Sequence, residues 1–268
     1  MIIILDLLGA GYLSFSYKID NISTIAEAEI VEYLDKDQES YRIYSPSYSI
    51  SQNLAAEHAL ELADGVDPLQ IKSYSEYMIS ATGIAVSGYN VTIPPFRSGN
   101  PSVDNQGKKP DAKLLGLLNV KYVVSEFEIF AEGLVLLETK FEQEIYLNEL
   151  YMPRAWVEGS NLEDSKSDTY KRGKNIRWID KQPNLIHLEA DGPGILVLSE
   201  IYYPGWVAYV DGIRHEIEPA YDVLRSVSLE DGTHDVYFKF RPLSIYAGLI
   251  LAALGWIYTL WNFIKEKH

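Results

Sequence analysis

The feature that most constrains this chain is a charge-free run near its C-terminus. Residues 245–264 read IYAGLILAALGWIYTLWNFI and contain no Asp, Glu, Lys or Arg. A helix of about 20 apolar residues can cross the hydrocarbon core of a bilayer, which is roughly 30 Å thick. We therefore expect one transmembrane helix at residues 243–264, followed by a short cytoplasmic tail at residues 265–268.

The aromatic residues of this run support the same interpretation. Tyr246 lies near one end, and Trp256, Tyr258 and Trp261 lie toward the other, as Trp and Tyr do at membrane interfaces. The alternative is a buried core helix of a soluble protein, but buried helices of this length rarely lack every charge. Basic residues flank both ends, so the positive-inside rule alone does not fix the orientation.

Small residues recur along the same run. Gly248, Ala252 and Gly255 fall four and then three residues apart, so they share one face of a helix. Small side chains on one face allow close approach of a second helix in lipid. We expect this face to pack against other transmembrane helices; chance clustering in a lone anchor is the alternative.

Composition excludes several classes of function. The 268 residues carry 38 Asp plus Glu against 23 Lys plus Arg, a formal net charge of −15, which argues against a nucleic-acid partner. The absence of Cys excludes a disulfide scaffold and a Cys nucleophile. The five His residues have no metal-ligand spacing, and neither a P-loop nor a nucleophile elbow occurs. We predict no cofactor and no metal, and we identify no catalytic residue.

The first soluble region, residues 14–152, alternates helix and strand patterns and is predicted to be an extracytoplasmic α/β region. Before it, residues 1–13 are apolar but too short to span a bilayer, so they are the end of a preceding membrane helix or a buried strand. Residues 94–111 are rich in Pro, Gly, Ser and Asn and predict a loop. We expect helices at 24–34, 53–62, 68–79 and 112–118, and strands at 41–44, 121–125, 134–137 and 144–147.

The pattern changes to short, regularly spaced strands over residues 153–242. Alternating apolar and polar residues bounded by Gly, Pro, Asn or Asp predict a jelly-roll-like antiparallel β-sandwich. Asp211-Gly212 predicts a type I′ hairpin turn, and Asp231-Gly232 predicts the next turn. A polar loop is expected at residues 161–172. The predicted fold class is therefore α+β: an α/β region, a β-sandwich and one C-terminal transmembrane helix.

One aromatic segment of the predicted sandwich suits carbohydrate binding. The sequence IYYPGW at residues 201–206 joins two predicted strands, and exposed aromatic faces beside an Arg can stack on sugars and bond their hydroxyls. The alternative is structural: Pro204-Gly205 makes a turn and Trp206 fills the core. The candidate sugar-binding residues are Tyr202, Tyr203, Trp206, Tyr209, Tyr221 and Arg225.

The run from Ser199 to Gly248 resembles the C-terminal end of YfhO-type bacterial membrane proteins, relatives of the GT-C glycosyltransferases. It carries YYPGW, the VDG turn and FRPLS directly before the last apolar run. Upstream motifs follow in the order found in that family: DGVDPL at 64–69, LLNVKYVV at 117–124 and MPRA at 152–155. The resemblance covers nearly the whole chain but includes no catalytic motif.

The resemblance implies a function in cell-envelope glycan or glycolipid assembly. The chain would be the non-catalytic extracytoplasmic portion of such a protein, anchored in the cell membrane, where it positions a lipid-linked sugar or an acceptor glycan. Its partners would be membrane lipid and other transmembrane helices or an upstream multi-pass subunit, since family members carry a membrane half before this region. We expect a fragment or one product of a split gene, and whether it takes part in catalysis stays open.

Two other classes of function compete with that expectation. The chain could be a single-pass, membrane-anchored surface module that binds carbohydrate or protein by itself. A free-standing hydrolase is the third hypothesis, and the absence of catalytic motifs argues against it.

Overall fold

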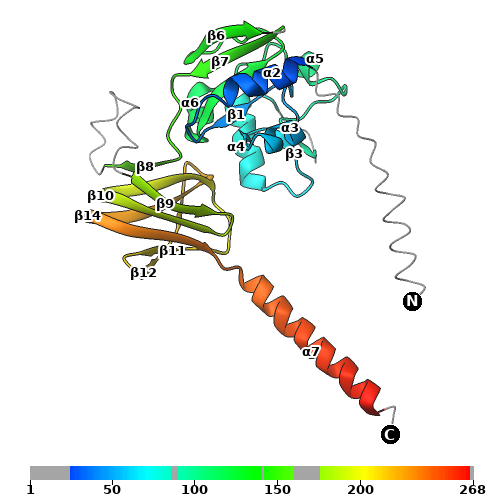
Figure 1. The fold of residues 1–268 in the computed structure, drawn as a ribbon, viewed down its shortest axis with the longest axis vertical. Helices are drawn as coiled ribbons and strands as arrows, with labels where there is room; N and C mark the ends of the chain where they lie inside the picture. Colours follow the sequence, from blue (N-terminus) through cyan, green and yellow to red (C-terminus); the bar gives the residue numbers. More distant parts are fainter. Residues whose placement is uncertain (1–24, 86–89, 141, 160–175, 266–268) are drawn as a thin grey trace.

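The computed structural model consists of a helix-and-strand part, a sheet part and one projecting C-terminal helix (Figure 1). It describes residues 25–85, 90–140, 142–159 and 176–265. The predictions made for the first 13 residues and for the polar loop at 161–172 lie outside these ranges. The predicted α+β class is confirmed, since helices and mostly antiparallel strands occur together.

The helix-and-strand part, residues 25–148, contains a five-stranded sheet in the order β2-β1-β5-β7-β6. Strand β1 pairs in parallel with both β2 and β5, whereas β5, β7 and β6 pair antiparallel. The strands of this sheet are β1 (Arg42–Tyr44), β2 (Glu61–Leu62), β5 (Val120–Ser125), β6 (Leu134–Lys140) and β7 (Gln143–Asn148). A separate pair is formed by β3 (Gly65–Val66) and β4 (Thr92–Ile93).

Three helices of this part begin at polar capping residues. The side chains of Ser51, Asn100 and Asp111 accept hydrogen bonds from backbone N–H groups three residues later, which satisfies a donor that the helix leaves free. The helices are α2 (Ile25–Leu34), α3 (Gln52–Glu57), α4 (Lys72–Thr82), α5 (Pro101–Asn105) and α6 (Ala112–Leu117).

Three sequence predictions in this part are corrected. The helix predicted at 53–62 ends at Glu57, because the chain turns at Ala59, whose φ is 55°, and then enters β2 beside β1. Helix α4 begins at Lys72, so Pro68 precedes the helix instead of starting it. The loop predicted at 94–111 contains the short helix α5, which Asn100 caps.

The sheet part, residues 155–242, contains seven strands in one hydrogen-bonded set. Its main order is β12-β11-β14-β10-β8, with β9 on β10 and β13 on β14, and every pairing is antiparallel. The strands are β8 (Ala155–Glu158), β9 (Ile176–Gln182), β10 (Leu185–Ile201), β11 (Trp206–Val210), β12 (Ile213–His215), β13 (Glu218–Ala220) and β14 (Leu224–Phe240). The jelly-roll form of the predicted sandwich is not confirmed.

Strands β10 and β14 are each 17 residues long, although only short strands are predicted for residues 153–242. The turn predicted at Asp231-Gly232 is wrong, because β14 runs through it and Gly232 pairs with Gly192. A Cβ on Gly192 would lie 1.8 Å from the carbonyl oxygen of Glu230, so only glycine permits this approach. The turn at Asp211-Gly212 is confirmed: both residues have positive φ, 51° and 80°, as a type I′ hairpin requires.

Two apolar cores hold the sheet part. One lies between the two halves of the β10–β14 pair, where Leu188, Leu196 and Phe238 are fully buried. The other joins the two parts of the body: Trp156 and Val197 pack in one cluster with residues of α4, α6 and β5. Because this cluster crosses residue 153, the predicted domain boundary there stays a prediction.

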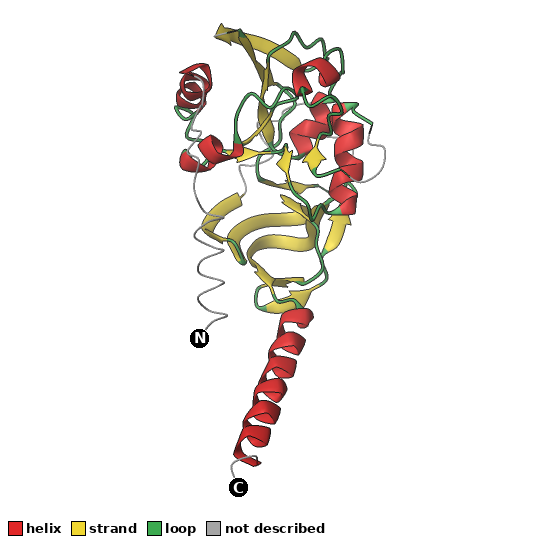
Figure 2. Ribbon diagram, turned by 90° about the vertical axis from the view of Figure 1, so that its right-hand side faces the viewer, coloured by secondary structure: helices red, strands yellow, loops and turns green. Residues whose placement is uncertain are grey.

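Helix α7 (Leu243–Lys265) leaves the end of the sheet part and projects from the body (Figure 2). It has 23 residues, none of them buried, and it is long and apolar enough to cross a membrane. No described atom outside α7 would touch a Cβ on Gly248 or Gly255. Packing of the face that also carries Ala252 against another helix therefore stays a prediction.

The close packing of α6 on the loop after β7 is testable by replacing Gly116 with alanine. The new Cβ would lie 2.2 Å from the carbonyl oxygen of Leu150, so the loop or the helix must move. We expect Gly116→Ala to lower the free energy of unfolding by about 1–3 kcal/mol, as overpacking does. Chemical denaturation in detergent measures this, and the exposed Lys113→Ala on the same helix is the control. Equal stabilities of the two variants would contradict the close contact.

Candidate functional site

A surface cleft of about 410 Å³ lies between the segment that enters β11 and the segment that follows β12. Tyr202, Tyr203 and Trp206, the first residue of β11, line one side, and Arg214 of β12 and Glu216 after it line the other. We call it the β11–β12 cleft. Both strands lie at the end of the sheet part from which α7 departs (Figure 1).

The turn before β11 fixes the cleft next to α7. Gly205 has a φ of 106°, and a Cβ there would lie 3.0 Å from both Phe240 and Pro242. The backbone N–H of Arg241 donates a hydrogen bond of 2.6 Å to the carbonyl oxygen of Gly205. Since α7 begins at Leu243, the wall of the cleft is bonded directly to the short connection that leads into the helix.

Trp206 is held in the cleft wall by a buried arginine. Its ring lies 5.4 Å from the ring of Phe240, and the guanidinium of Arg225 lies 3.7 Å from the centroid of its indole. Nε of Arg225 donates to the carbonyl oxygen of Ile201 at 2.9 Å, and only 6% of the residue is exposed. A cation stacked on an indole face is attractive, and more so when it is desolvated. Trp206 is therefore both a core-facing residue and a wall of the cleft.

The electrostatics of Arg225 follow from its burial. Loss of hydration, with repulsion from Arg154 and Arg42, lowers the pKa of Arg225 to about 10, although Glu200 opposes the shift. The guanidinium therefore remains charged at neutral pH. Its charge lies behind the Trp206 ring and not in the cleft itself.

The six predicted sugar-binding residues do not form one site. Tyr202, Tyr203 and Trp206 line the cleft. The other three lie elsewhere: Arg225 behind Trp206, Tyr209 on the opposite face of β11 beside Lys239, and Tyr221 against Glu158 and Trp156. Sugar binding by the three that line the cleft stays a prediction.

Sequence reasoning missed the opposite wall of the cleft. Arg214, His215 and Glu216 line it, although they are more than seven residues from Trp206 in the chain. The Asp211-Gly212 turn was the signal that could have found them. A two-residue hairpin pairs Ala208 with His215, which brings the end of β12 back to the start of β11.

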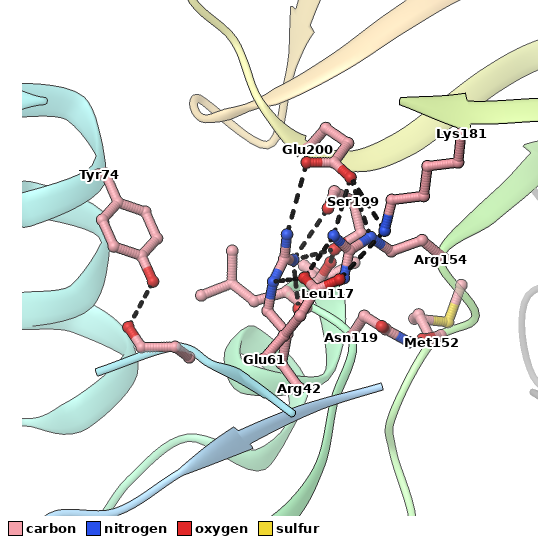
Figure 3. A network of polar contacts seen from close by, with 12 residues as sticks. Arg42, Glu61, Tyr74, Leu117, Asn119, Met152, Arg154, Lys181, Ser199 and Glu200 are labelled. Carbon is pink, nitrogen blue, oxygen red and sulfur yellow. Dashed lines mark hydrogen bonds and ion pairs between the residues drawn. The ribbon is translucent and has the colours of Figure 1, made fainter. Parts of the chain in front are cut away.

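A network of ion pairs lies where the two parts of the body meet (Figure 3). Arg154, of which 5% is exposed, bonds Glu61 at 2.6 Å and Glu200 at 2.8 Å. Arg42 of β1 donates to the carbonyl oxygens of Leu118 and Ser199 at 2.8 and 2.9 Å. Charged groups so far from water persist only when they are paired and hydrogen-bonded.

The charges of this network control the ionisation of Glu61. Burial opposes the charged form of the carboxyl, but Arg154, Arg42 and Lys181 outweigh it and lower the pKa of Glu61 to about 2. The pKa of Glu200 is lowered in the same way, against its burial, by Arg154 and Arg42. Both carboxylates therefore stay ionised through the physiological range and neutralise part of the arginine charge.

The described residues include no group of His, Asp and Glu that could hold a metal ion. Comparisons with protein-family models, curated protein sequences and solved structures found no match for this chain. The resemblance to YfhO-type proteins therefore stays an expectation from sequence motifs.

The ion-pair network predicts acid sensitivity of the fold. The pKa of Glu61 is below its ordinary value of 4.5, so its stabilising effect is complete above that value and is lost as the pH falls toward about 2. We expect Glu61→Gln to lower the free energy of unfolding by about 1–3 kcal/mol at neutral pH, because Arg154 loses a charged partner. The variant should then lose less stability than the wild type on acidification from about pH 5 to about pH 2.

Urea unfolding across that pH range measures both effects. Glu57→Gln is the control, since Glu57 is exposed and forms no ion pair within the described part of the chain. A Glu61→Gln variant with the pH profile of the wild type would contradict the role of the network.

Proposed function

We propose that this chain is the membrane-anchored, non-catalytic extracytoplasmic portion of a YfhO/GT-C-like protein of cell-envelope glycan or glycolipid assembly. Its β11–β12 cleft positions a lipid-linked sugar or an acceptor glycan. The observation that carries the proposal is the location of an aromatic cleft beside the start of a membrane-length helix. The sequence resemblance supports the assignment to envelope assembly.

The chemistry of the cleft suits a sugar. Tyr203 is 47% exposed, and with Trp206 it offers an aromatic face on which sugar C–H groups stack. Arg214 and Glu216 on the opposite wall supply a donor and an acceptor for hydroxyl groups. The volume of about 410 Å³ falls in the range of small-molecule pockets, roughly 300–1,000 Å³.

The position of the cleft favours a ligand that belongs to the membrane. Only Arg241 and Pro242 separate the end of β14 from the start of α7. With α7 across a bilayer, the cleft lies close to the headgroup layer. A lipid-linked sugar could then place its sugar in the cleft while its acyl or prenyl chain remains in the hydrocarbon core.

Membrane anchoring by α7 has a direct test. The full-length chain should sediment with membranes, resist extraction at alkaline pH and require detergent for release, because about 20 apolar residues strongly favour the hydrocarbon core. Ultracentrifugation followed by immunoblotting measures the distribution. Full-length protein in the aqueous supernatant without detergent would overturn the anchor and, with it, the proposed function.

Ligand binding by the cleft has a matched pair of variants. We expect Trp206→Ala to weaken binding to a cognate glycan by about tenfold, since loss of an aromatic stacking partner costs about 1–2 kcal/mol. Trp178→Ala is the control, because Trp178 is also a partly exposed strand residue but lies on β9 and not in the cleft.

A glycan array and a panel of prenyl-phosphate-linked sugars, probed with the detergent-solubilised full chain, supply the measurement. Circular dichroism establishes that each variant is folded. Binding that both variants reduce equally, or no binding to any member of either panel, argues against a ligand site in the cleft.

The alternative function is a single-pass surface module that binds carbohydrate or protein by itself. The exposed aromatic cleft favours it as much as it favours the first proposal. Co-purification separates the two: a portion of a larger assembly retains a multi-pass membrane protein in mild detergent, whereas a self-sufficient module purifies alone and still binds its ligand.

A further inference from the structure

Basic residues in strands β9 to β14 and the two residues after them fall into two groups. In the first, carboxylates pair with Arg177 and Lys181, and Arg225 is buried behind Trp206. Members of the second group have no ion-pair partner among the residues that the structure describes. They are Arg214, Lys239 and Arg241.

The three unpaired cations lie on β12, on the last residues of β14 and just after β14. Lys239 pairs across the strands with Val207, and its Nζ lies 5.5 Å from the ring centroid of Tyr209. Tyr209 in turn pairs with Arg214 on the next strand. Arg241 follows β14 directly and bonds the turn before β11 through its backbone. Strands β11 and β12 lie on the side of the sheet part from which α7 departs (Figure 1), and Arg214 lines the cleft together with Trp206.

The end of β14 corresponds to the headgroup layer of a bilayer crossed by α7. The polar layer of each leaflet is roughly 5–8 Å thick, and a strand rises about 3.3 Å per residue. Arg241 precedes the first residue of α7 by two positions, so it lies within that layer.

The charge of this end contrasts with that of the whole chain. The protein has a formal net charge of −15, yet the cations nearest α7 have no carboxylate partner within the described residues. An acidic protein is repelled by an anionic bilayer except where unpaired basic residues meet it. Glu216, two residues after Arg214, is a negative charge on the same wall of the cleft.

We propose that Arg214, Lys239 and Arg241 form a binding surface for the phosphate of anionic phospholipids. The surface holds the sheet part against the bilayer, so that the β11–β12 cleft faces the headgroup layer at a fixed distance. The inference rests on the proposed membrane anchor, but it does not require that the cleft bind sugar. It assigns to these three residues an orienting role that α7 alone, attached at a single point, cannot supply.

The test uses the full-length chain in detergent micelles and two lipids with identical acyl chains. Native mass spectrometry titrates phosphatidylglycerol against phosphatidylcholine and yields the ratio of the two affinities. We expect the wild type to prefer phosphatidylglycerol, and the triple variant R214Q/K239Q/R241Q to lose that preference by at least tenfold. Each cation near an anionic surface contributes about fivefold. Arg177→Gln, an exposed arginine of the same sheet, is the control and should keep the preference.

The outcomes separate this inference from the proposed anchor. Equal affinities for the two lipids in the wild type would overturn it. A preference that the triple variant retains would also overturn it, since lipid binding would then belong to Lys265 and Lys267 at the other end of the apolar run. Failure of the anchor is seen instead as wild-type protein that needs no detergent to stay in solution. Circular dichroism and thermal unfolding in the same micelles establish that the triple variant is folded.

Discussion

The antiparallel pairing of β10 with β14 is the constraint on which the rest of the structure depends. The two strands are paired along nearly all of their 17 residues, from Leu185 opposite Lys239 to Ile201 opposite Leu224. One end of β10 carries Ser199 and Glu200 into the contact with the helix-and-strand part. The other end of β14 carries Phe240 to the cleft and the chain into α7. A single pair of strands therefore links the body, the cleft and the membrane-length helix.

The contact between the two parts combines an apolar cluster with buried charge. Trp156 and its neighbours supply the hydrophobic contribution to stability. Burial of Arg42 and Arg154 costs hydration free energy, which their ion pairs with carboxylates only partly offset. Such a network adds little net stability, but each charge is tolerated only in the one arrangement that pairs it. The charges therefore favour one relative placement of the two parts, which the apolar cluster alone would specify less strictly.

Arg225 connects the charges between the two parts with the wall of the cleft. This buried cation is repelled by Arg154 and Arg42, attracted by Glu200 and stacked on Trp206, so the wall of the cleft is coupled to the charges between the two parts. Arg225 and Trp206 are in direct contact, whereas Glu200, Arg154 and Arg42 act on Arg225 through their charge. The wall of the cleft is therefore held both by the buried Arg225 behind Trp206 and by the turn at Gly205, which is bonded to Arg241.

The sequence by itself determined the features that depend on near neighbours in the chain. A charge-free run specified the helix α7, alternating side chains specified most strands of the sheet part, and Asp211-Gly212 specified a hairpin turn, because length, period and positive φ are local properties. Only the tertiary structure decided that β10 and β14 continue through glycines that resemble turns, since a glycine serves a turn and a close strand crossing equally well. It alone placed Arg225 behind Trp206 and joined Arg42 to Ser199, 157 residues away. Such contacts depend on how distant segments pack, and no local pattern of residues encodes that packing.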